Sequence, residues 1–258
     1  MDTPVLTHIE DRVGYVTLNR PDKRNALSPE LIGTLGAAFS DFAQRKEVKV
    51  VVLRAEGKAF CAGADLAYLE ELQQNSFEEN LADSRRLGQL FSQIYEFPKP
   101  VIAQVQGHAL AGGCGLVTVC DFAFAAAEAK FGYTEAKIGF VPALVSVFLA
   151  EQIGQAKATE LLLSAEVISA EKAANLGLVT EVVDTGKLEA RVLDFAQQLV
   201  TENSAFSMQE TKRLLRSLNA KSRQEALDQA AEANAKARGH ADCVKGIAAF
   251  LSKTKPSW

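Results

Sequence analysis

Four glycines fall within nine residues of the stretch Val105–Leu116, and they constrain the fold more than any other feature of the sequence. The stretch reads VQGHALAGGCGL, so an apolar strand pattern runs into Gly107, Gly112, Gly113 and Gly115 and then into a short apolar helix pattern. Glycine lets bare backbone approach a neighbour closely, at a cost in conformational entropy. The glycines therefore predict either backbone N–H donors held toward a ligand at a helix N-terminus or a tightly packed strand-to-helix turn.

Neither of the common nucleotide-binding loops matches this stretch. A dinucleotide fingerprint needs the spacing G-x-G-x-x-G, but Thr118 stands where the third glycine should follow Gly113 and Gly115. A P-loop needs a lysine after its second glycine, and Gly112 is followed by Gly113 and a cysteine. A ligand at this turn would therefore meet backbone donors, which suit a group that carries or develops negative charge.

The overall composition is that of an ordinary globular protein. The 258 residues are 48% hydrophobic and 23% charged, with a formal net charge of −4, so the chain can bury a sizeable core. The mixed charges give no electrostatic reason to bind nucleic acid. No run reaches the roughly 18 apolar residues of a membrane span, and the first residues lack a signal-peptide pattern. We therefore expect a cytoplasmic protein that binds neither membrane nor nucleic acid.

The cysteines and histidines predict no metal site and no disulfide framework. Their spacings match no metal-binding or redox motif, and they are Cys61, Cys114, Cys120, Cys243, His8, His108 and His240. Cys61 and Cys114 lie in glycine-containing turns, where a nucleophilic thiol is conceivable, although small buried thiols are far more common.

Hydrophobic periodicity predicts an α/β protein. Residues 13–19 alternate as a strand, and Ser28 followed by Pro29 predicts the start of a helix whose apolar face continues to Phe42. Residues 48–54 form a near-continuous apolar run, which is typical of a strand covered on both faces. A loop over 55–65, a long helix over 81–94, and strands at 101–105, 120–125 and 178–183 follow, with an extended piece at 131–136. From about residue 155 helical patterns dominate. The alanine-rich helix over 226–237 needs close neighbours, in this chain or in another subunit.

Glu135 is the most promising acidic residue for chemistry. It lies between the largely apolar segments 131–134 and 138–141, so its carboxylate is expected to be partly desolvated, which raises a carboxyl pKa and suits it to proton transfer near neutral pH. A Glu135–Lys137 pair in a surface loop explains the spacing equally well. Asp65 is expected to cap the helix after the 55–65 loop rather than to act as an acid or base.

Taken together, these segments resemble the enoyl-CoA hydratase/isomerase (crotonase) family over nearly the whole chain. The matching motifs, in order, are Asn19-Arg20-Pro21 with Asn25-Ala26-Leu27, AFCAGADL, VQGHALAGGCGL, CDFAFA, FGYTEAKIGFVP and SAEVISAEKAANLGLV. The closing stretch GIAAFLSKTKPSW, and the combination of GGCGL with FVPALVSVFL, look most like bacterial methylglutaconyl-CoA hydratase-like members.

The resemblance implies a fold, an assembly and a site. It implies a crotonase-like spiral of ββα turns over residues 1–195, which holds the CoA-thioester site, and a helical region over 196–258 that forms a homotrimer or a dimer of trimers. It implies oxyanion-hole N–H groups on Ala62 and Gly112, and Glu135 as the catalytic acid–base. It further implies that an acyl-CoA thioester contacts the residues Arg24, Ala26, Ala62, Gly63, Ala64, Asp65 and Gly112. No metal and no cofactor beyond the substrate's own coenzyme A are implied.

The sequence departs from the family pattern at two places. The hydratases of the family usually carry a first glutamate where this chain has Gly115, and a glycine-rich segment where it has Ala143-Leu144-Val145. A single glutamate is the pattern of isomerases, which need only one base to move a proton between carbons. We expect an enoyl-CoA hydratase-type lyase; the alternatives are an enoyl-CoA delta-isomerase that uses Glu135 as its proton shuttle, and a noncatalytic acyl-CoA-binding protein.

Overall fold

The described part of the chain, residues 3–254 without the side chains of residues 66 and 221, builds two sheets that share one core in the computed structural model. The larger sheet has the strand order β1 (Val5–Glu10), β2 (Val13–Leu18), β3 (Val50–Ala55), β5 (Val101–Val105), β7 (Phe122–Ala126) and β10 (Glu181–Val183). Only the β1–β2 pair of this sheet is antiparallel. The smaller sheet contains β4 (Ala59–Cys61), β6 (His108–Leu110), β8 (Lys130–Gly132) and β9 (Ile168–Ser169).

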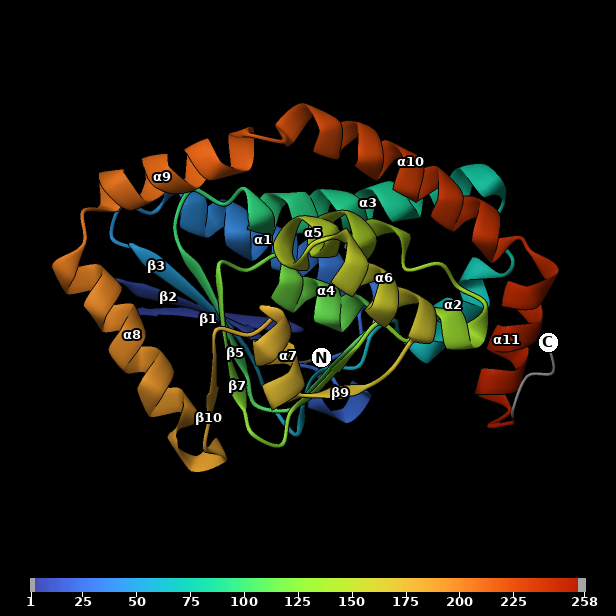
Figure 1. Ribbon diagram of the computed structural model, residues 1–258, viewed down its shortest axis with the longest axis horizontal. Helices are drawn as coiled ribbons and strands as arrows, with labels where there is room; N and C mark the ends of the chain where they lie inside the picture. Colours follow the sequence, from blue (N-terminus) through green and yellow to red (C-terminus); the bar gives the residue numbers. More distant parts are fainter. Residues whose placement is uncertain (1–2, 255–258) are drawn as a thin grey trace.

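The two sheets grow together because the chain repeats one unit. A long strand of the larger sheet is followed by a short strand of the smaller sheet and then by helix, as in β5, β6 and α4 (Gly112–Thr118). The same order gives β3 and β4 before α2 (Leu66–Leu72) and α3 (Phe77–Tyr95), and β7 and β8 before η2 (Glu135–Ile138), α5 (Ala143–Ile153) and α6 (Gln155–Ser164). This confirms the predicted spiral of ββα turns. Figure 1 shows strands β3, β5 and β7 of the larger sheet together with helices α1 (Pro29–Gln44), α3 and α4.

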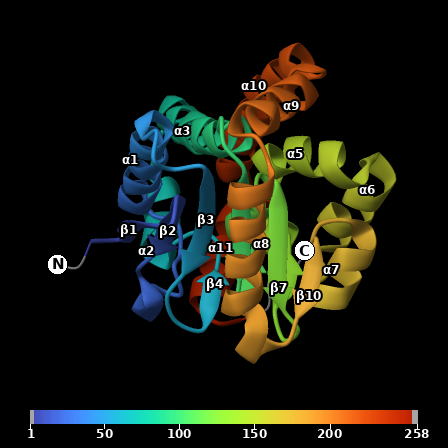
Figure 2. The same ribbon diagram turned by 90° about the vertical axis from the view of Figure 1, so that its left-hand side faces the viewer.

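Both faces of the larger sheet are covered, as the apolar run over 48–54 predicts. One face packs Val16, Val51 and Ala103 against α1, α3 and α4. The other face packs Tyr15, Val52 and Phe124 against Leu188, Val192, Ala196 and Leu199 of α8 (Leu188–Glu202). Figure 2 shows α8 lying along this second face. The predicted domain boundary after residue 195 falls inside α8, so the helices that leave the sheet begin with α9 (Ala205–Ser217).

Several local predictions are confirmed by hydrogen bonds at helix ends. The Ser28 side chain accepts from the Leu31 N–H at the start of α1, and the Ser169 side chain caps α7 (Ala170–Leu176), which ends at Gly177 in the left-handed conformation. The extended piece expected over 131–136 is shorter than predicted, because the chain turns into η2 at Glu135. Strand β1 was not predicted; it forms a hairpin with β2 through Asp11 and Arg12, both with positive φ.

The C-terminal helices α9, α10 (Ala220–Arg238) and α11 (Ala241–Leu251) wrap the core. The alanine-rich part of α10 finds its neighbours in this chain: Leu227, Ala230 and Ala231 join the main core beside residues of α3 and α5. Among the described residues, no helix is long and apolar enough to cross a membrane.

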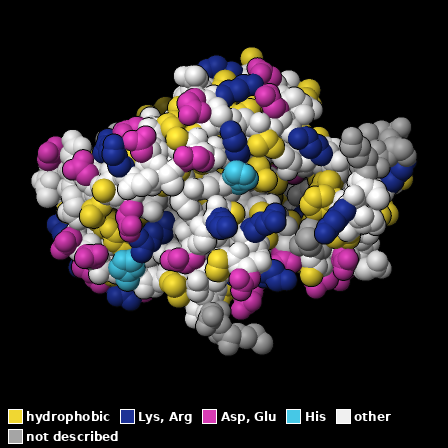
Figure 3. All heavy atoms as spheres, turned by 90° about the horizontal axis from the view of Figure 1, so that it is seen from below, with side chains coloured by type: hydrophobic (Ala, Val, Ile, Leu, Met, Phe, Trp, Pro, Cys, Tyr) yellow, Lys and Arg dark blue, Asp and Glu magenta, His cyan; other side chains and the backbone are white. Residues whose placement is uncertain are grey.

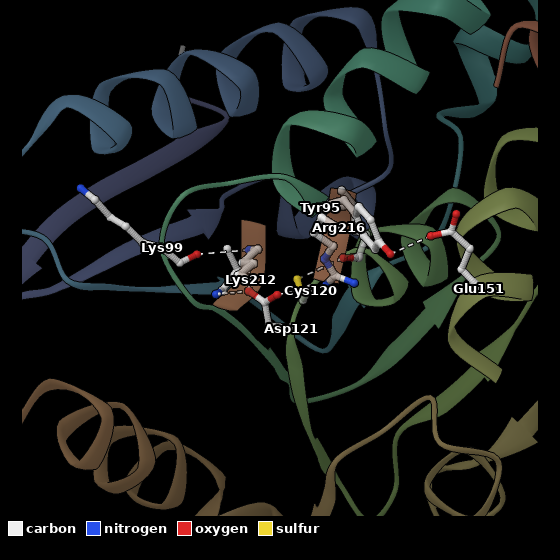
Figure 4. Close-up of polar contacts among 9 residues, drawn as sticks. Tyr95, Lys99, Cys120, Asp121, Glu151, Lys212 and Arg216 are labelled. Carbon is white, nitrogen blue, oxygen red and sulfur yellow. Dashed lines mark hydrogen bonds and ion pairs between the residues drawn. The ribbon is translucent and has the colours of Figure 1, made fainter. Parts of the chain in front are cut away.

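Helix α9 is tied to the sheet by a buried ionic contact. Asp121, which precedes β7, accepts hydrogen bonds from Lys212 Nζ at 2.6 Å and from Arg216 Nη2 at 3.0 Å (Figure 4). The Arg216 guanidinium also lies 3.6 Å from the centre of the Tyr95 ring, whose hydroxyl donates to Glu151 at 2.8 Å. These contacts use one side of α9, while Phe206 and Leu214 of the helix and Leu218 directly after it remain exposed.

Candidate active site

Three loops meet where the strands of the smaller sheet end. Strands β4, β6 and β8 are parallel, so their carboxyl ends lie along one edge. Residues 62–64 follow β4, Ala111 and Gly112 follow β6, and Glu135 is the third residue after β8. The Ala111 N–H donates to the Gly132 carbonyl at 2.7 Å, which ties the turn before α4 to the strand that leads to Glu135. The fold therefore assembles the predicted site from segments about 70 residues apart.

A cavity of about 430 Å³ opens at this edge. The residues from the three loops that line it are Ala62, Ala64, Ala111, Gly112, Thr134 and Glu135, and apolar side chains from α2, α3 and α5 complete most of its wall. Gly246 and Phe250 of α11 also line it, because η2 packs directly on that helix; a Cβ on Gly246 would lie 2.4 Å from the Ile138 carbonyl oxygen. Helix α11 thus supports the segment that carries Glu135.

The glycines of the opening stretch serve both purposes left open by the sequence. A Cβ on Gly107 would lie 2.0 Å from the Lys58 carbonyl oxygen, and one on Gly113 would lie 2.3 Å from that of Cys61, so these two glycines permit close packing. Gly112 differs. It opens α4 and lines the cavity, and among the described residues no acceptor takes its N–H. Its donor is therefore available at a helix N-terminus.

The prediction that Ala62 supplies the second N–H is wrong. The Ala62 N–H donates to the Arg24 carbonyl at 3.0 Å and is already satisfied. A different N–H group in this loop is available, as the pairing of the loop with Leu27 shows. The Leu27 N–H donates to the Gly63 carbonyl, and the Asp65 N–H donates to the Leu27 carbonyl. Leu27 and Ala64 therefore form a parallel bridge. In such a bridge the N–H of Ala64 points away from its partner strand. No described residue accepts from it, and Ala64 lines the cavity.

Glu135 is placed as a proton-transfer group should be. Its Oε2 atom is buried and has no hydrogen-bond partner among the described residues, so it does not pair with Lys137. Burial raises the pKa of Glu135 to about 7, against a smaller lowering by its own backbone N–H. The surface-pair alternative is therefore excluded, and Glu135 can both take and give a proton near neutral pH.

The position of the missing first glutamate is filled with apolar side chains. A Cβ on Gly115 would lie 2.5 Å from Val145 Cγ1 and 2.9 Å from Phe91 Cζ. The two departures from the family pattern therefore contact each other: Gly115 replaces the usual first glutamate, and Val145 lies in the segment that is usually glycine-rich. This contact leaves no room for a second carboxylate in that turn.

Four residues expected to contact substrate lie outside the cavity lining. Asp65 caps α2 by accepting from the Ala67 N–H at 3.0 Å, as expected, and it also pairs with Arg20 at 2.9 Å. Ala26 is buried and Gly63 has a φ of +93°. Arg24 has an exposed side chain and a left-handed backbone. Asp65 and Gly63 thus shape the loop that presents Ala64.

The thiols near the site are unsuited to nucleophilic catalysis. Cys61 and Cys114 are fully buried, and burial raises the pKa of each to about 12. Neither thiol ionises near neutral pH, so both are packing residues.

Sequence reasoning missed the polar residues at another part of the same cavity. Tyr68, Asp83, Asn234 and Arg238 also line it, and Arg238 Nη1 donates to Asp83 Oδ2 at 2.9 Å. The only signal in the sequence is the spacing of four between Asn234 and Arg238, which places both on one face of a helix.

Comparisons with known proteins show the family to which the chain belongs. The family model described as enoyl-CoA hydratase/isomerase matches residues 8–258. A protein of Thermus thermophilus, provisionally named an enoyl-CoA hydratase, is 43% identical over 244 residues, which span 95% of this chain and 96% of that protein. The crystal structure of an enoyl-CoA hydratase/isomerase from Xanthobacter autotrophicus superposes with a TM-score of 0.90 at 31% identity, covering 98% of this chain and 94% of the other. An enoyl-CoA hydratase structure from Mycobacterium avium gives a TM-score of 0.89 at 32% identity over the full length of both chains.

Proposed function

Since the chain belongs to the enoyl-CoA hydratase/isomerase family, we propose that it is a hydratase-type lyase that adds water to a 2-enoyl-CoA thioester, or removes it in reverse. The observation that carries this proposal is the unpartnered, buried carboxyl of Glu135 in the cavity that Ala64 and Gly112 also line. The family acts on acyl-CoA thioesters, so coenzyme A enters as part of the substrate, and the proposal includes no other cofactor.

The proposed oxyanion hole consists of the Ala64 and Gly112 N–H groups. Addition to the β-carbon of a 2-enoyl thioester places negative charge on the thioester carbonyl oxygen, and fixed N–H donors stabilise that charge without reorganising. One such donor is worth on the order of 3 kcal/mol of transition-state stabilisation. Ala64 replaces Ala62 in this role because only the Ala64 N–H is free of an acceptor in the described chain.

One carboxyl can serve both halves of the hydration. Glu135 as carboxylate removes a proton from water while the water oxygen bonds to C3 and the C2=C3 electron pair moves toward the thioester carbonyl. The resulting enolate then takes the proton from Glu135 at C2, which restores the carboxylate. A pKa of about 7 suits a group that must act as base and then as acid in one turnover.

The contact of Gly115 with Val145 and Phe91 favours a second candidate, an enoyl-CoA delta-isomerase. In that reaction Glu135 removes a proton from C2 of a 3-enoyl thioester and returns it to C4, and no water needs a second carboxylate to orient it. The names of the similar proteins support hydratase activity. The contact of Gly115 with Val145 and Phe91 supports isomerase activity. A noncatalytic acyl-CoA-binding protein is the third candidate, and retention of Glu135 beside both free N–H groups argues against it.

A panel of 2-enoyl- and 3-enoyl-CoA thioesters tests the proposal. Products are followed by the ultraviolet absorbance of the conjugated thioester and by mass spectrometry. Water addition raises the product mass by one water, whereas isomerisation leaves it unchanged. Gain of water from a 2-enoyl substrate supports the lyase, conversion at constant mass supports the isomerase, and binding without turnover of any thioester supports the noncatalytic protein.

We also propose that the phosphates of coenzyme A lie near the exposed Arg24, outside the cavity, with the backbone of Ala26 nearby. The carbonyl of Arg24 holds the Ala62 N–H, so a ligand at Arg24 would be adjacent to the loop that presents Ala64. Lysine and arginine side chains lie across the middle of the face shown in Figure 3, which suits a polyanionic group. The cytoplasmic location expected from the sequence remains part of the proposal.

The trimer or dimer of trimers is likewise a proposal. It is supported by the exposed apolar side chains of α9, since Phe206 is 73% and Leu215 is 62% exposed. The resemblance to methylglutaconyl-CoA hydratase-like members stays a prediction, and the last residues on which it rests, 255–258, lie outside the described residues.

A further inference from the structure

The cavity that contains Glu135 has a polar end within a largely apolar wall. Tyr68 of α2, Asp83 of α3, and Asn234 and Arg238 of α10 line this part. Asp83, Asn234 and Arg238 are each less than 8% exposed. A plain hydrocarbon chain would gain nothing from such groups, and burying them costs free energy unless each is hydrogen-bonded. Their unpaired atoms therefore indicate what the cavity is built to receive.

Arg238 has one edge occupied and one edge free. Its Nη1 donates to Asp83 Oδ2 at 2.9 Å and to Asn80 Oδ1 at 3.3 Å. Its Nε is buried and has no partner, and its Nη2 makes no hydrogen bond with any described residue. The Nε–Nη2 edge of a guanidinium presents two parallel N–H groups, which match the two oxygens of a carboxylate.

Asn234 adds a third polar group one helical turn away from Arg238. Its Nδ2 donates to the Ser84 hydroxyl at 3.2 Å, and its Oδ1 is buried without a partner in the described chain. A hydroxyl can donate as well as accept. Rotation of the Asn234 amide would therefore keep a hydrogen bond with Ser84 and leave the NH2 group free to donate to an anion.

The charges around this end favour an anion. Both oxygens of Asp83 are engaged, Oδ1 by the Tyr68 hydroxyl and Oδ2 by Arg238. Burial and the bond to Asp83 raise the pKa of Tyr68 against the opposing effect of Arg238 and Arg86, so Tyr68 stays neutral. Arg238 is offset by Asp83, and Lys137 lines the same cavity as Glu135, whose charge it can balance. Arg86, whose charge acts on Tyr68 although its side chain does not line the cavity, is then the remaining positive group to balance a ligand's negative group.

We propose that this polar end binds a carboxylate at the far end of the acyl chain, so that the preferred substrate is a CoA monothioester of an unsaturated dicarboxylic acid. Arg238 would hold the carboxylate through its Nε–Nη2 edge, and Asn234 would donate the third hydrogen bond. This inference rests on the proposed function, because it assigns the acyl chain to the cavity that contains Glu135. An ion pair that only fastened α10 to α3 would need neither an unpaired Nε on Arg238 nor an unpaired amide oxygen on Asn234.

The test compares matched thioesters in pairs. Each 2-enoyl-CoA with a terminal carboxylate, over a series of chain lengths, is paired with the thioester that ends in a methyl group. The measured quantity is the ratio of kcat/KM within each pair, together with calorimetric binding of the corresponding saturated thioesters, which does not depend on turnover. At one chain length the wild-type ratio is expected to favour the carboxylate by about tenfold or more.

Two arginine variants separate recognition from packing. Arg238→Lys can keep an ion pair with Asp83 but loses the two parallel N–H groups, so the preference for the carboxylate should fall by about tenfold or more in both turnover and binding. Arg223→Lys is the matched control: Arg223 is on the same helix, is 2% exposed and pairs with Glu151 at 3.2 Å, but it does not line the cavity. The ratio should not change in Arg223→Lys.

The outcomes distinguish this inference from the function on which it rests. If the methyl-ended thioesters are turned over and bound as well as the carboxylates at every chain length, the inference is wrong and the proposed function stands. The same conclusion follows if Arg238→Lys keeps the wild-type ratio. If no thioester is turned over but saturated carboxylates still bind more tightly than their partners, the proposed function fails and the carboxylate site stands.

Discussion

Val145 packs so closely against Gly115 that a Cβ on Gly115 would lie 2.5 Å from Val145 Cγ1. Gly115→Glu alone should therefore crowd the core and bury a charge, so we expect a melting temperature lower by several degrees and no gain in water addition. Combining Gly115→Glu with Val145→Gly removes the tighter contact and leaves only the Phe91 ring to shift, so the double variant should hydrate faster than Val145→Gly alone. Thermal unfolding and mass-resolved turnover check both expectations. A single Gly115→Glu variant that is stable and hydrates faster would contradict the steric account.

The raised pKa of Glu135 predicts a dependence of stability on pH. The carboxyl has a pKa near 4.5 when unfolded and about 7 when folded, so the folded protein binds the extra proton between these values. The contribution of this group to the free energy of unfolding is fully present below pH 4.5. It is lost as the pH rises through 7, which lowers the free energy of unfolding by up to about 3 kcal/mol. Glu135→Gln removes this loss. The free energy of unfolding of the variant should gain on the wild type between pH 5 and pH 8, and a constant difference would show that Glu135 is not desolvated.

The Gly112 N–H can be tested by removing it. Gly112 is the first residue of α4, where proline is tolerated because its ring matches the helical φ. Gly112→Pro should lower kcat by roughly 10²-fold or more while the circular dichroism spectrum is retained. Gly112→Ala keeps the N–H and meets only the end of the Leu27 side chain, so it controls for added bulk. Equal losses in the two variants would remove the oxyanion role from Gly112.

Much of the fold was predictable from local patterns, whereas the donors of the site were not. Ser28, Ser169 and Asp65 cap helices as their spacing predicts, and the run over 48–54 is covered on both faces. Strands β4 and β6 were missed because three-residue strands among small residues show no clear periodicity.

The choice between Ala62 and Ala64 depends on which residue bridges to Leu27, and that pairing joins segments far apart in the chain. The polar end of the cavity was out of reach for the same reason. Asp83 and Arg238 meet only because α10 returns to lie on α3. The local spacing of residues predicts neither the Leu27–Ala64 bridge nor the Asp83–Arg238 ion pair.

The exposed apolar side of α9 predicts assembly. Lys212 and Arg216 fix one side of the helix to Asp121. The apolar side chains that remain exposed are Phe206, Leu214 and Leu215 of the helix and Leu218 directly after it. Light scattering at micromolar concentration should give three or six times the chain mass of 27.8 kDa. Leu214→Asp with Leu218→Asp should shift the protein toward the single chain. A wild-type mass of one chain would contradict the prediction.

The most direct test of the account is the turnover of Glu135→Gln on the best thioester substrate of the wild type. Glutamine keeps the size and the hydrogen-bonding groups of the side chain but cannot accept the proton, so kcat should fall by on the order of 10²- to 10⁴-fold while thioester binding changes little. Glu160→Gln, which makes the same change at an exposed glutamate outside the cavity lining, serves as the control for the loss of a charge. Full activity in folded Glu135→Gln would show that Glu135 does not transfer the proton and that the proposed mechanism is wrong.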